Sequence, residues 1–313
     1  MVFPHVIIVG APKCATTSLY HYLQEHPDIF MSPFKESSFF IRNIYRNLHT
    51  KDHTRGFYRR HTPMTWHAYE QLFCEAKPGQ VIGDASVGYL PYHKEAIPNI
   101  KRFVGDPKII IMLRDPIQRT YSSFRHMRME TGGPSRFDEY LGMDSQGNGN
   151  WSVLYLPITA SRYARAVSQY LHSFSDVKII LAEELRRYPL TTMREIYSWL
   201  GVAENHVPDV STHHNRSYIP RSRTLQRFLD SDTPIMRTFR HIARKSNLHN
   251  PITSAIDTIN TTKDHPQDIE PEHIRHLFTD DIQELNRMGI DLPWWDYAAS
   301  TTLTDPSKTP AMA

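Results

Sequence analysis

The chain has 313 residues, of which 40% are hydrophobic and 22% charged, a composition typical of one large globular domain or two small ones. Its formal net charge of +3 is too small to indicate a nucleic-acid-binding protein, and its two cysteines cannot form a disulfide framework. No apolar run approaches the ~20 residues of a membrane-spanning helix. Because the first predicted strand begins almost at Met1, we expect a soluble cytoplasmic protein without a leader or an anchor.

The first predicted element is a buried parallel strand that leads through a tight turn into a helix. The strand is the β-branched run Val6–Val9, and Gly10 ends it. Hydroxyl groups at Thr16–Ser18 favour a helix start. Such a turn directs unpaired N–H groups and the positive end of the helix dipole to one point, where Lys13 adds a full charge. We therefore predict an anion-binding loop; an ordinary turn with an incidental lysine is the alternative.

This loop lacks the second glycine and the late lysine of the nucleoside-triphosphate loop. It resembles instead the 5′-phosphosulfate loop of sulfotransferases, commonly P-K-x-G-T-T, which binds 3′-phosphoadenosine 5′-phosphosulfate (PAPS). Ala15 stands where that family has glycine, so either a left-handed backbone there costs alanine roughly 1 kcal/mol or the turn is ordinary. The resemblance assigns to donor binding the residues Pro12, Lys13, Cys14, Ala15, Thr16, Thr17 and Ser18.

A second stretch, Lys35–Phe40, is similar to the K-E-x-x-F-F segment that carbohydrate-type sulfotransferases carry beside the acceptor. The resemblance implies a catalytic role for Lys35, in contact with the transferring sulfonate or a polar acceptor, with Glu36 holding it. A surface ion pair between neighbours is equally compatible. Residues 42–78 then combine His, Arg and aromatic side chains without clean periodicity. They suit a sugar, aryl or anionic acceptor, as they suit a solvated face, and no metal-ligand spacing indicates a metal site.

Asp84 follows a predicted strand at the edge where open α/β sheets bind ligands. The segment Gly83–Leu90 resembles the G-E-x-S-P-x-Y-L segment of carbohydrate-type sulfotransferases, whose glutamate is the proposed catalytic base. The resemblance therefore assigns Asp84 as the base, although its side chain is one carbon shorter. A carboxylate that caps a helix or turn is the alternative, and His93 and His67 are the fallback bases.

The second phosphate-binding candidate follows the predicted strand Lys108–Leu113. Asp115-Pro116 is a strong helix start, and Arg119 adds local positive charge on that helix. Arg114 leaves the strand, and Ser122 lies roughly 10 Å along the helix, a gap that an arginine side chain can bridge. Both can hold one phosphate, the arginine as a fork and the serine as a donor. The pattern is similar to the 3′-phosphate motif of sulfotransferases.

The strand at 177–181 and the helices at 160–174 and 190–200 continue an alternation of strands and helices. This order predicts an α/β fold, a mostly parallel sheet with helices on both faces, as in the P-loop kinase-like three-layer sandwich that the resemblance implies. We expect one domain over residues 1–299, with 42–78 and 143–160 on the acceptor side, and a flexible tail at 300–313. The resemblance adds three residues to the donor site, namely Tyr163, Arg221 and Arg223; a solvated basic face is as compatible for the arginines.

Together these motifs imply a sulfotransferase that moves a sulfonate from PAPS to a hydroxyl or amine of a small-molecule, lipid or saccharide acceptor, without a metal. Asp84 would take the acceptor's proton, and Lys13 with the loop N–H groups would stabilise charge on the bridging oxygen. Arg114 and Ser122 would hold the 3′-phosphate. A small-molecule kinase, which needs a full phosphate loop and magnesium carboxylates, and a non-catalytic nucleotide-binding protein of the same fold are the alternatives.

Overall fold

The computed structural model describes residues 3–47, 58, 61–128, 133–145, 152–211, 219–220, 261–262 and 272–295. In this part of the chain five parallel strands form one sheet, in the order β2-β3-β1-β4-β5. They are β1 (Val6–Gly10), β2 (Ile29–Met31), β3 (Val81–Ala85), β4 (Lys108–Leu113) and β5 (Val177–Leu181). The predicted parallel α/β sheet is confirmed.

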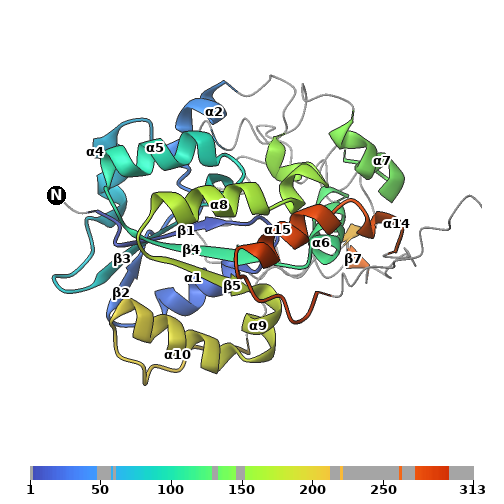
Figure 1. Cartoon of the computed structure of the whole chain (residues 1–313). Helices are drawn as coiled ribbons and strands as arrows, with labels where there is room; N and C mark the ends of the chain where they lie inside the picture. Colours follow the sequence, from blue (N-terminus) through green and yellow to red (C-terminus); the bar gives the residue numbers. More distant parts are fainter. Residues whose placement is uncertain are drawn as a thin grey trace, which may run out of the picture.

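Helices cover both faces of the sheet, with α5 and α8 on one side and α1 and α10 on the other (Figure 1). The α-helices are α1 (Thr16–Gln24), α2 (Arg42–Arg46), α4 (Trp66–Glu70), α5 (His93–Phe103), α6 (Pro116–Met127), α7 (Phe137–Leu141), α8 (Ala164–Ser173), α9 (Ala182–Arg187), α10 (Pro189–Leu200), α14 (Glu272–Arg275) and α15 (Thr279–Arg287). The described part of the chain also contains the 3-10 helices η1 (Phe39–Ile41), η2 (Gln71–Phe73), η3 (Val87–Tyr89), η4 (Gly142–Asp144), η5 (Val153–Tyr155) and η6 (Thr159–Ser161). The short strands β6 (Ile219–Pro220) and β7 (Thr261–Thr262) pair antiparallel.

The two central strands consist almost entirely of buried apolar side chains, as a parallel sheet covered on both faces requires. Every residue of β1 is buried, and β4 is buried from Ile109 to Leu113. Strand β1 pairs with β3 on one side and β4 on the other, so the segments that leave these three strands start at one edge of the sheet. That edge is where ligands bind in open α/β sheets.

Helix α8 begins four residues later than the predicted helix at 160–174. The Asp281 carboxylate on α15 accepts hydrogen bonds from the backbone N–H groups of Tyr163, at 2.6 Å, and Ala164, at 3.2 Å. A side chain more than a hundred residues away therefore caps this helix start, which local sequence does not reveal. Among the described residues, no helix combines the length and the apolar character needed to cross a membrane.

Part of the predicted acceptor region packs as an aromatic cluster between η1, α4 and α5. Phe39 stacks on Tyr69 with ring centroids 4.5 Å apart, and Trp66 stacks on Phe103 at 5.4 Å. Of these residues, Tyr69 lies in the core and Trp66 packs against it. Residues 48–57, 59–60 and 146–151 of the predicted acceptor side lie outside the described residues, as does the tail at 300–313.

Candidate functional site

The turn between β1 and α1 contains two residues with left-handed backbone conformations, Lys13 at φ 68° and Ala15 at φ 62°. Ala15 occupies the cap position of α1, so the turn is not an ordinary one. Alanine tolerates there a conformation that costs a residue with a side chain about 1 kcal/mol. Hydrogen bonds from the neighbouring strand hold the turn, because Ala11 N–H donates to Met112 O at 2.7 Å and Arg114 Nη1 donates to Lys13 O at 3.3 Å.

Arg119 on α6 lies behind this turn and is completely buried. Its Nε donates to Pro12 O at 3.3 Å, and its Nη2 donates to Leu154 O at 2.7 Å. Its Nη1 reaches the carbonyl oxygens of Leu156 and Pro157 and the hydroxyl of Ser161. This side chain therefore joins the Lys13 turn to the segment 154–161, a role that the sequence shows only as local positive charge.

The charge on Lys13 is costly in this environment. Burial, followed by the positive charges of Arg119, Arg114 and Lys35, lowers the pKa of Lys13 to about 8. A bound anion removes part of that cost, because it supplies the opposite charge that the described surroundings do not place beside the ammonium.

Lys13, Arg114 and Ser122 line the same cavity, which has a volume of about 400 Å³. The structure thus brings together the two phosphate-binding candidates that stand about a hundred residues apart. Its other lining residues are Pro12, Ala15, Thr16, Thr17, Ser18, Lys35, Glu36, Tyr58, Val87, Ser123, His126, Leu154 and Tyr155. We call it the main cavity.

A smaller cavity of about 230 Å³ adjoins the main cavity, because Ala15, Ser18 and Arg114 line both. We call it the side cavity. Its remaining lining is mostly apolar: Tyr22, Ala182, Glu183, Leu185, Arg186, Pro189 and Val210. Arg114 therefore lies at the junction of a charged compartment and a mainly apolar one.

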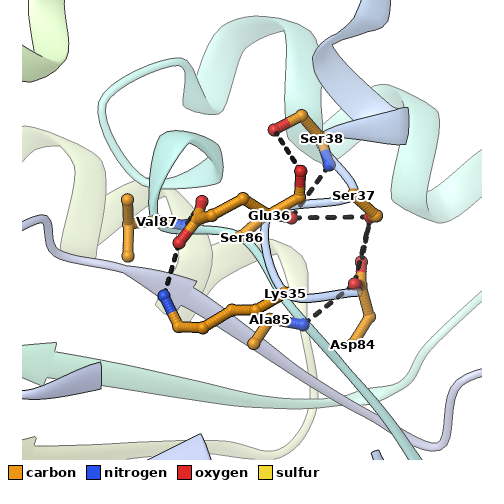
Figure 2. A network of polar contacts seen from close by, with 8 residues as sticks. All are labelled: Lys35, Glu36, Ser37, Ser38, Asp84, Ala85, Ser86 and Val87. Carbon is orange, nitrogen blue, oxygen red and sulfur yellow. Dashed lines mark hydrogen bonds and ion pairs between the residues drawn. The ribbon is translucent and has the colours of Figure 1, made fainter. Parts of the chain in front are cut away.

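Lys35 and Glu36 line the main cavity from the turn that follows β2. The Lys35 ammonium contacts Glu36 Oε1 at 2.6 Å, and both side chains keep slightly under a fifth of their surface exposed. Val87 N–H donates to Glu36 Oε2 at 2.9 Å, so both carboxylate oxygens are held in place (Figure 2). Glu36 is the one carboxylate among the described residues that line the main cavity.

Asp84, the predicted base, lines neither the main cavity nor the side cavity. Its side chain has no exposed surface, and its carboxylate accepts hydrogen bonds from Ser37 Oγ at 3.0 Å and from Tyr69 and Tyr89 hydroxyls at 3.1 and 3.0 Å. Burial raises the pKa of Asp84 to about 6, although these hydrogen bonds oppose the shift. The backbone N–H of Ala85 is a fourth donor to this carboxylate, at 2.9 Å. The assignment of Asp84 as the base stays a prediction; of the two carboxylates, Glu36 lines the main cavity and Asp84 does not.

Glu36 and Asp84 both belong to segments at the carboxyl ends of neighbouring parallel strands, β2 and β3. Their positions in the sequence therefore do not show which of the two carboxylates lines a cavity. Which of the two faces solvent depends on Tyr69 and Tyr89, which enclose Asp84 from α4 and η3.

Two other predicted site residues, Tyr163 and Cys14, contact the segments that line the cavities but do not line them themselves. Tyr163 is buried and its hydroxyl donates to Arg114 O at 3.0 Å. Cys14 is also buried, with its Sγ 3.7 Å from that hydroxyl. Neither lines a cavity, so both hold the turn and the end of β4 rather than face a ligand. Arg221 and Arg223 lie outside the described residues.

The histidines lie differently from the prediction. His67 is exposed on α4 and His93 is half-buried on α5, and neither lines the main cavity. His126, one helical turn beyond Ser122, does line it. Burial and the nearby charge of Lys13 lower the pKa of His126 to about 4, so its imidazole is neutral near pH 7. Among the described residues, no group of three or more His, Cys, Asp or Glu side chains is arranged to hold a metal ion.

Comparison with known proteins gives one consistent result. The model of the sulfotransferase family matches residues 4–206. Over 222 residues the chain is 29% identical to a mouse protein named bifunctional heparan sulfate N-deacetylase/N-sulfotransferase 4, a match that covers 65% of the chain and 23% of that protein. It is 24% identical over 201 residues to mouse heparan sulfate glucosamine 3-O-sulfotransferase 3B1, covering 64% of the chain and 46% of that protein. The match thus spans less than half the length of these curated relatives.

A solved structure extends the likeness to nearly the whole chain. The crystal structure of a sulfotransferase from Alicyclobacillus acidocaldarius superimposes with a TM-score of 0.69 at 27% identity. The superposition covers 93% of this chain and 98% of that one. The fold and the order of the site-bearing elements are therefore those of a solved protein of this kind.

Proposed function

The chain belongs to the sulfotransferase family, and from this premise we propose that it transfers a sulfonate group from PAPS to a hydroxyl or amine of a saccharide or small-molecule acceptor. The observation that carries the proposal is the main cavity, where the Lys13 turn, the Arg114–Ser122 pair and the Glu36 carboxylate meet. The family match gives no support to a small-molecule kinase.

The two adjoining cavities suit the two ends of the donor. The Lys13 turn, with its N–H groups and ammonium, would bind the 5′-phosphosulfate. Arg114 and Ser122 would hold the 3′-phosphate. The adenine base would enter the side cavity, whose apolar side chains include Leu185 and Val210.

The chemistry is an in-line displacement at sulfur. The acceptor oxygen or nitrogen attacks the sulfur atom while its proton passes to Glu36, and the bond between sulfur and the bridging phosphate oxygen breaks. Negative charge develops on that bridging oxygen, where Lys13 and the N–H groups of the turn stabilise it. The products are the sulfated acceptor and adenosine 3′,5′-bisphosphate. Lys35, which is paired with Glu36, would lie beside the transferring group.

A saccharide is the acceptor class that we favour. The relatives at 24% and 29% identity are named for heparan sulfate. Besides its charged residues, the main cavity is lined by Tyr58, Leu154 and Tyr155. Such walls stack on the apolar faces of sugar rings while polar groups fix the hydroxyls.

Two measurements test the proposal. By calorimetry without magnesium, adenosine 3′,5′-bisphosphate should bind much more tightly than adenosine 5′-monophosphate, and Arg114→Ala should remove most of the difference. Equal affinity for the two nucleotides would refute the assignment of the 3′-phosphate site. Incubation with labelled PAPS and a saccharide panel should yield a labelled product; binding without transfer to any acceptor would favour a non-catalytic protein.

A further inference from the structure

We propose that Asp84 is a positioning residue, whose buried carboxylate holds the Lys35–Ser38 turn and thereby fixes the Glu36 carboxylate in the main cavity. This inference rests on the proposed function and adds a residue that does not itself touch the acceptor. It follows from the hydrogen bonds between this turn and the end of β3.

Three consecutive residues of the turn are tied to three consecutive residues of β3 and its extension (Figure 2). Glu36 N–H donates to Ala85 O at 2.8 Å, and Ser38 N–H donates to Ser86 Oγ at 3.0 Å. Between them, Ser37 Oγ donates to the carboxylate of Asp84. The bond from Ser37 is the one of these three that ends on a carboxylate, and such hydrogen bonds are stronger than neutral ones.

The turn requires this support because its backbone is unfavourable. Glu36 has φ 67° and Ser38 has φ 54°, both in the left-handed region that residues with a side chain avoid. Such conformations persist only where the surroundings hold them, and they gather at functional sites. Ser37 stands between the two, so its bond to Asp84 acts at the centre of the strained segment. If the turn relaxed, the Glu36 side chain would leave Val87 N–H and the cavity wall.

The surroundings of Asp84 are arranged for an ionised carboxylate. Ser37, Tyr69, Tyr89 and the backbone N–H of Ala85 donate to it, and the Tyr20 hydroxyl is near enough to be affected by its charge. No cation among the described residues forms an ion pair with it; the closest charged pair on the turn is Lys35–Glu36. A neutral carboxyl would have to donate where three hydroxyls already donate, so protonation displaces one of them.

The raised pKa of Asp84, about 6, gives this arrangement a measurable signature. Above pH 6 the ionised carboxylate holds Ser37; below it the protonated form releases part of the network, and the turn loosens. The fall of kcat at low pH, its acid limb, should therefore track the protonation of Asp84, although Asp84 does not exchange a proton with the acceptor.

The test uses two variants that break the same link from opposite ends. Asp84→Asn and Ser37→Ala should each lower kcat roughly 10- to 100-fold, as expected when a reacting group is misplaced by about 1 Å. The dissociation constant of adenosine 3′,5′-bisphosphate should stay unchanged, because Lys13, Arg114 and Ser122 are untouched. The double variant should lose no more than the worse single variant, since both changes break one connection.

Tyr69→Phe is the matched control, because it removes a donor to Asp84 from α4 without touching the turn. It removes a hydrogen bond that stabilises the ionised carboxylate, so the acid limb should move to higher pH while kcat at pH 8 stays close to that of the unmodified protein. In Asp84→Asn the limb near pH 6 should disappear.

Several outcomes would overturn the inference. Wild-type kcat in folded Ser37→Ala would overturn it even if Asp84→Asn failed to fold. Parallel losses of nucleotide affinity and kcat in both variants would show a general structural role. If the proposed function is wrong, the unmodified protein will transfer no sulfonate, and this result is distinct from the outcomes above. Crystal structures of Ser37→Ala would still show whether the Glu36 carboxylate leaves Val87 N–H. A carboxylate that stays in place would contradict the inference.

Discussion

At the scale of single residues, the pKa of Lys13 links nucleotide affinity to pH. Because that pKa lies near 8 in the free protein, Lys13 loses its proton as pH rises above 8, whereas the phosphates of the ligand are already ionised. We expect the dissociation constant of adenosine 3′,5′-bisphosphate to rise by up to about tenfold per pH unit above 8. Calorimetry between pH 7 and 9.5 measures this rise.

Lys13→Arg is the control for this prediction. Arginine remains charged over the whole range, so its affinity should not fall with pH. An identical alkaline fall in both proteins would assign the effect to a group other than Lys13.

A second prediction at this scale concerns the choice between two carboxylates. Glu36→Gln keeps the shape of the side chain and removes the proposed base, so kcat should fall by about 100- to 10,000-fold, the usual contribution of general base catalysis. Affinity for adenosine 3′,5′-bisphosphate should remain. Steady-state kinetics with labelled PAPS provide the measurement.

Glu95→Gln, on α5 outside both cavities, is the matched control and should leave kcat close to that of the unmodified protein. If Glu36→Gln retained full activity while Asp84→Asn lost all of it, Asp84 would return as the base despite its burial.

At the scale of elements, Arg119 connects its own helix, α6, to the Lys13 turn and to the segment 154–161. Its guanidinium donates hydrogen bonds to Pro12 O in the Lys13 turn and to Leu154 O in η5. Arg119→Met keeps the apolar stem but removes the guanidinium donor from both carbonyl oxygens; Pro12 O keeps only the weak Cys14 thiol donor at 3.6 Å. We expect the free energy of unfolding to fall by on the order of 3 kcal/mol, measured by urea denaturation.

Arg102→Met on the exposed surface of α5 is the comparison for that loss, and should change the stability by less than about 0.5 kcal/mol. Equal effects of the two substitutions would show that the bonds of Arg119 contribute no more than a surface charge.

The elements also show what the sequence could and could not predict. Strands β1 and β4 follow from short β-branched runs, and the Lys13 turn and Arg114 follow from motifs at their ends. The start of α8 could not be predicted, because Asp281 caps it from α15. The burial of Asp84 could not be predicted either, because it depends on Tyr69 and Tyr89, which lie on two other elements.

At the scale of the whole molecule, the three segments that leave β1, β3 and β4 share one edge, and residues from all three line the main cavity. A ligand that bridges these segments binds the folded state alone. Saturating adenosine 3′,5′-bisphosphate at a hundred times its dissociation constant should raise the free energy of unfolding by about 2.7 kcal/mol. Thermal unfolding with and without the nucleotide measures this gain, and adenosine 5′-monophosphate at the same concentration should give much less.

The buried charge of Asp84 should also affect the stability of the molecule as a whole. Its pKa in the folded state, about 6, is above the ordinary value of 3.8, so the folded state binds the proton more tightly than the unfolded state. The contribution of Asp84 to stability is therefore largest below pH 4 and is lost as pH rises through 6, by about 3 kcal/mol in total. Asp84→Asn lacks this titration. We expect the stability of Asp84→Asn relative to the unmodified protein to increase between pH 4 and pH 7 in denaturant unfolding.

This pH dependence of stability is opposite to the one that we expect for activity. The ionised form, which we propose holds Glu36 in place, is the form that costs the fold free energy, as is common where function requires a buried charge. As pH rises from 5 to 7, kcat of the unmodified protein should increase, while its free energy of unfolding relative to that of Asp84→Asn should decrease. The comparison with Asp84→Asn cancels the effect of the other titrating groups on stability. If the two proteins kept a constant difference in stability over this range, Asp84 would have an ordinary pKa, and the acid limb of kcat would belong to another group.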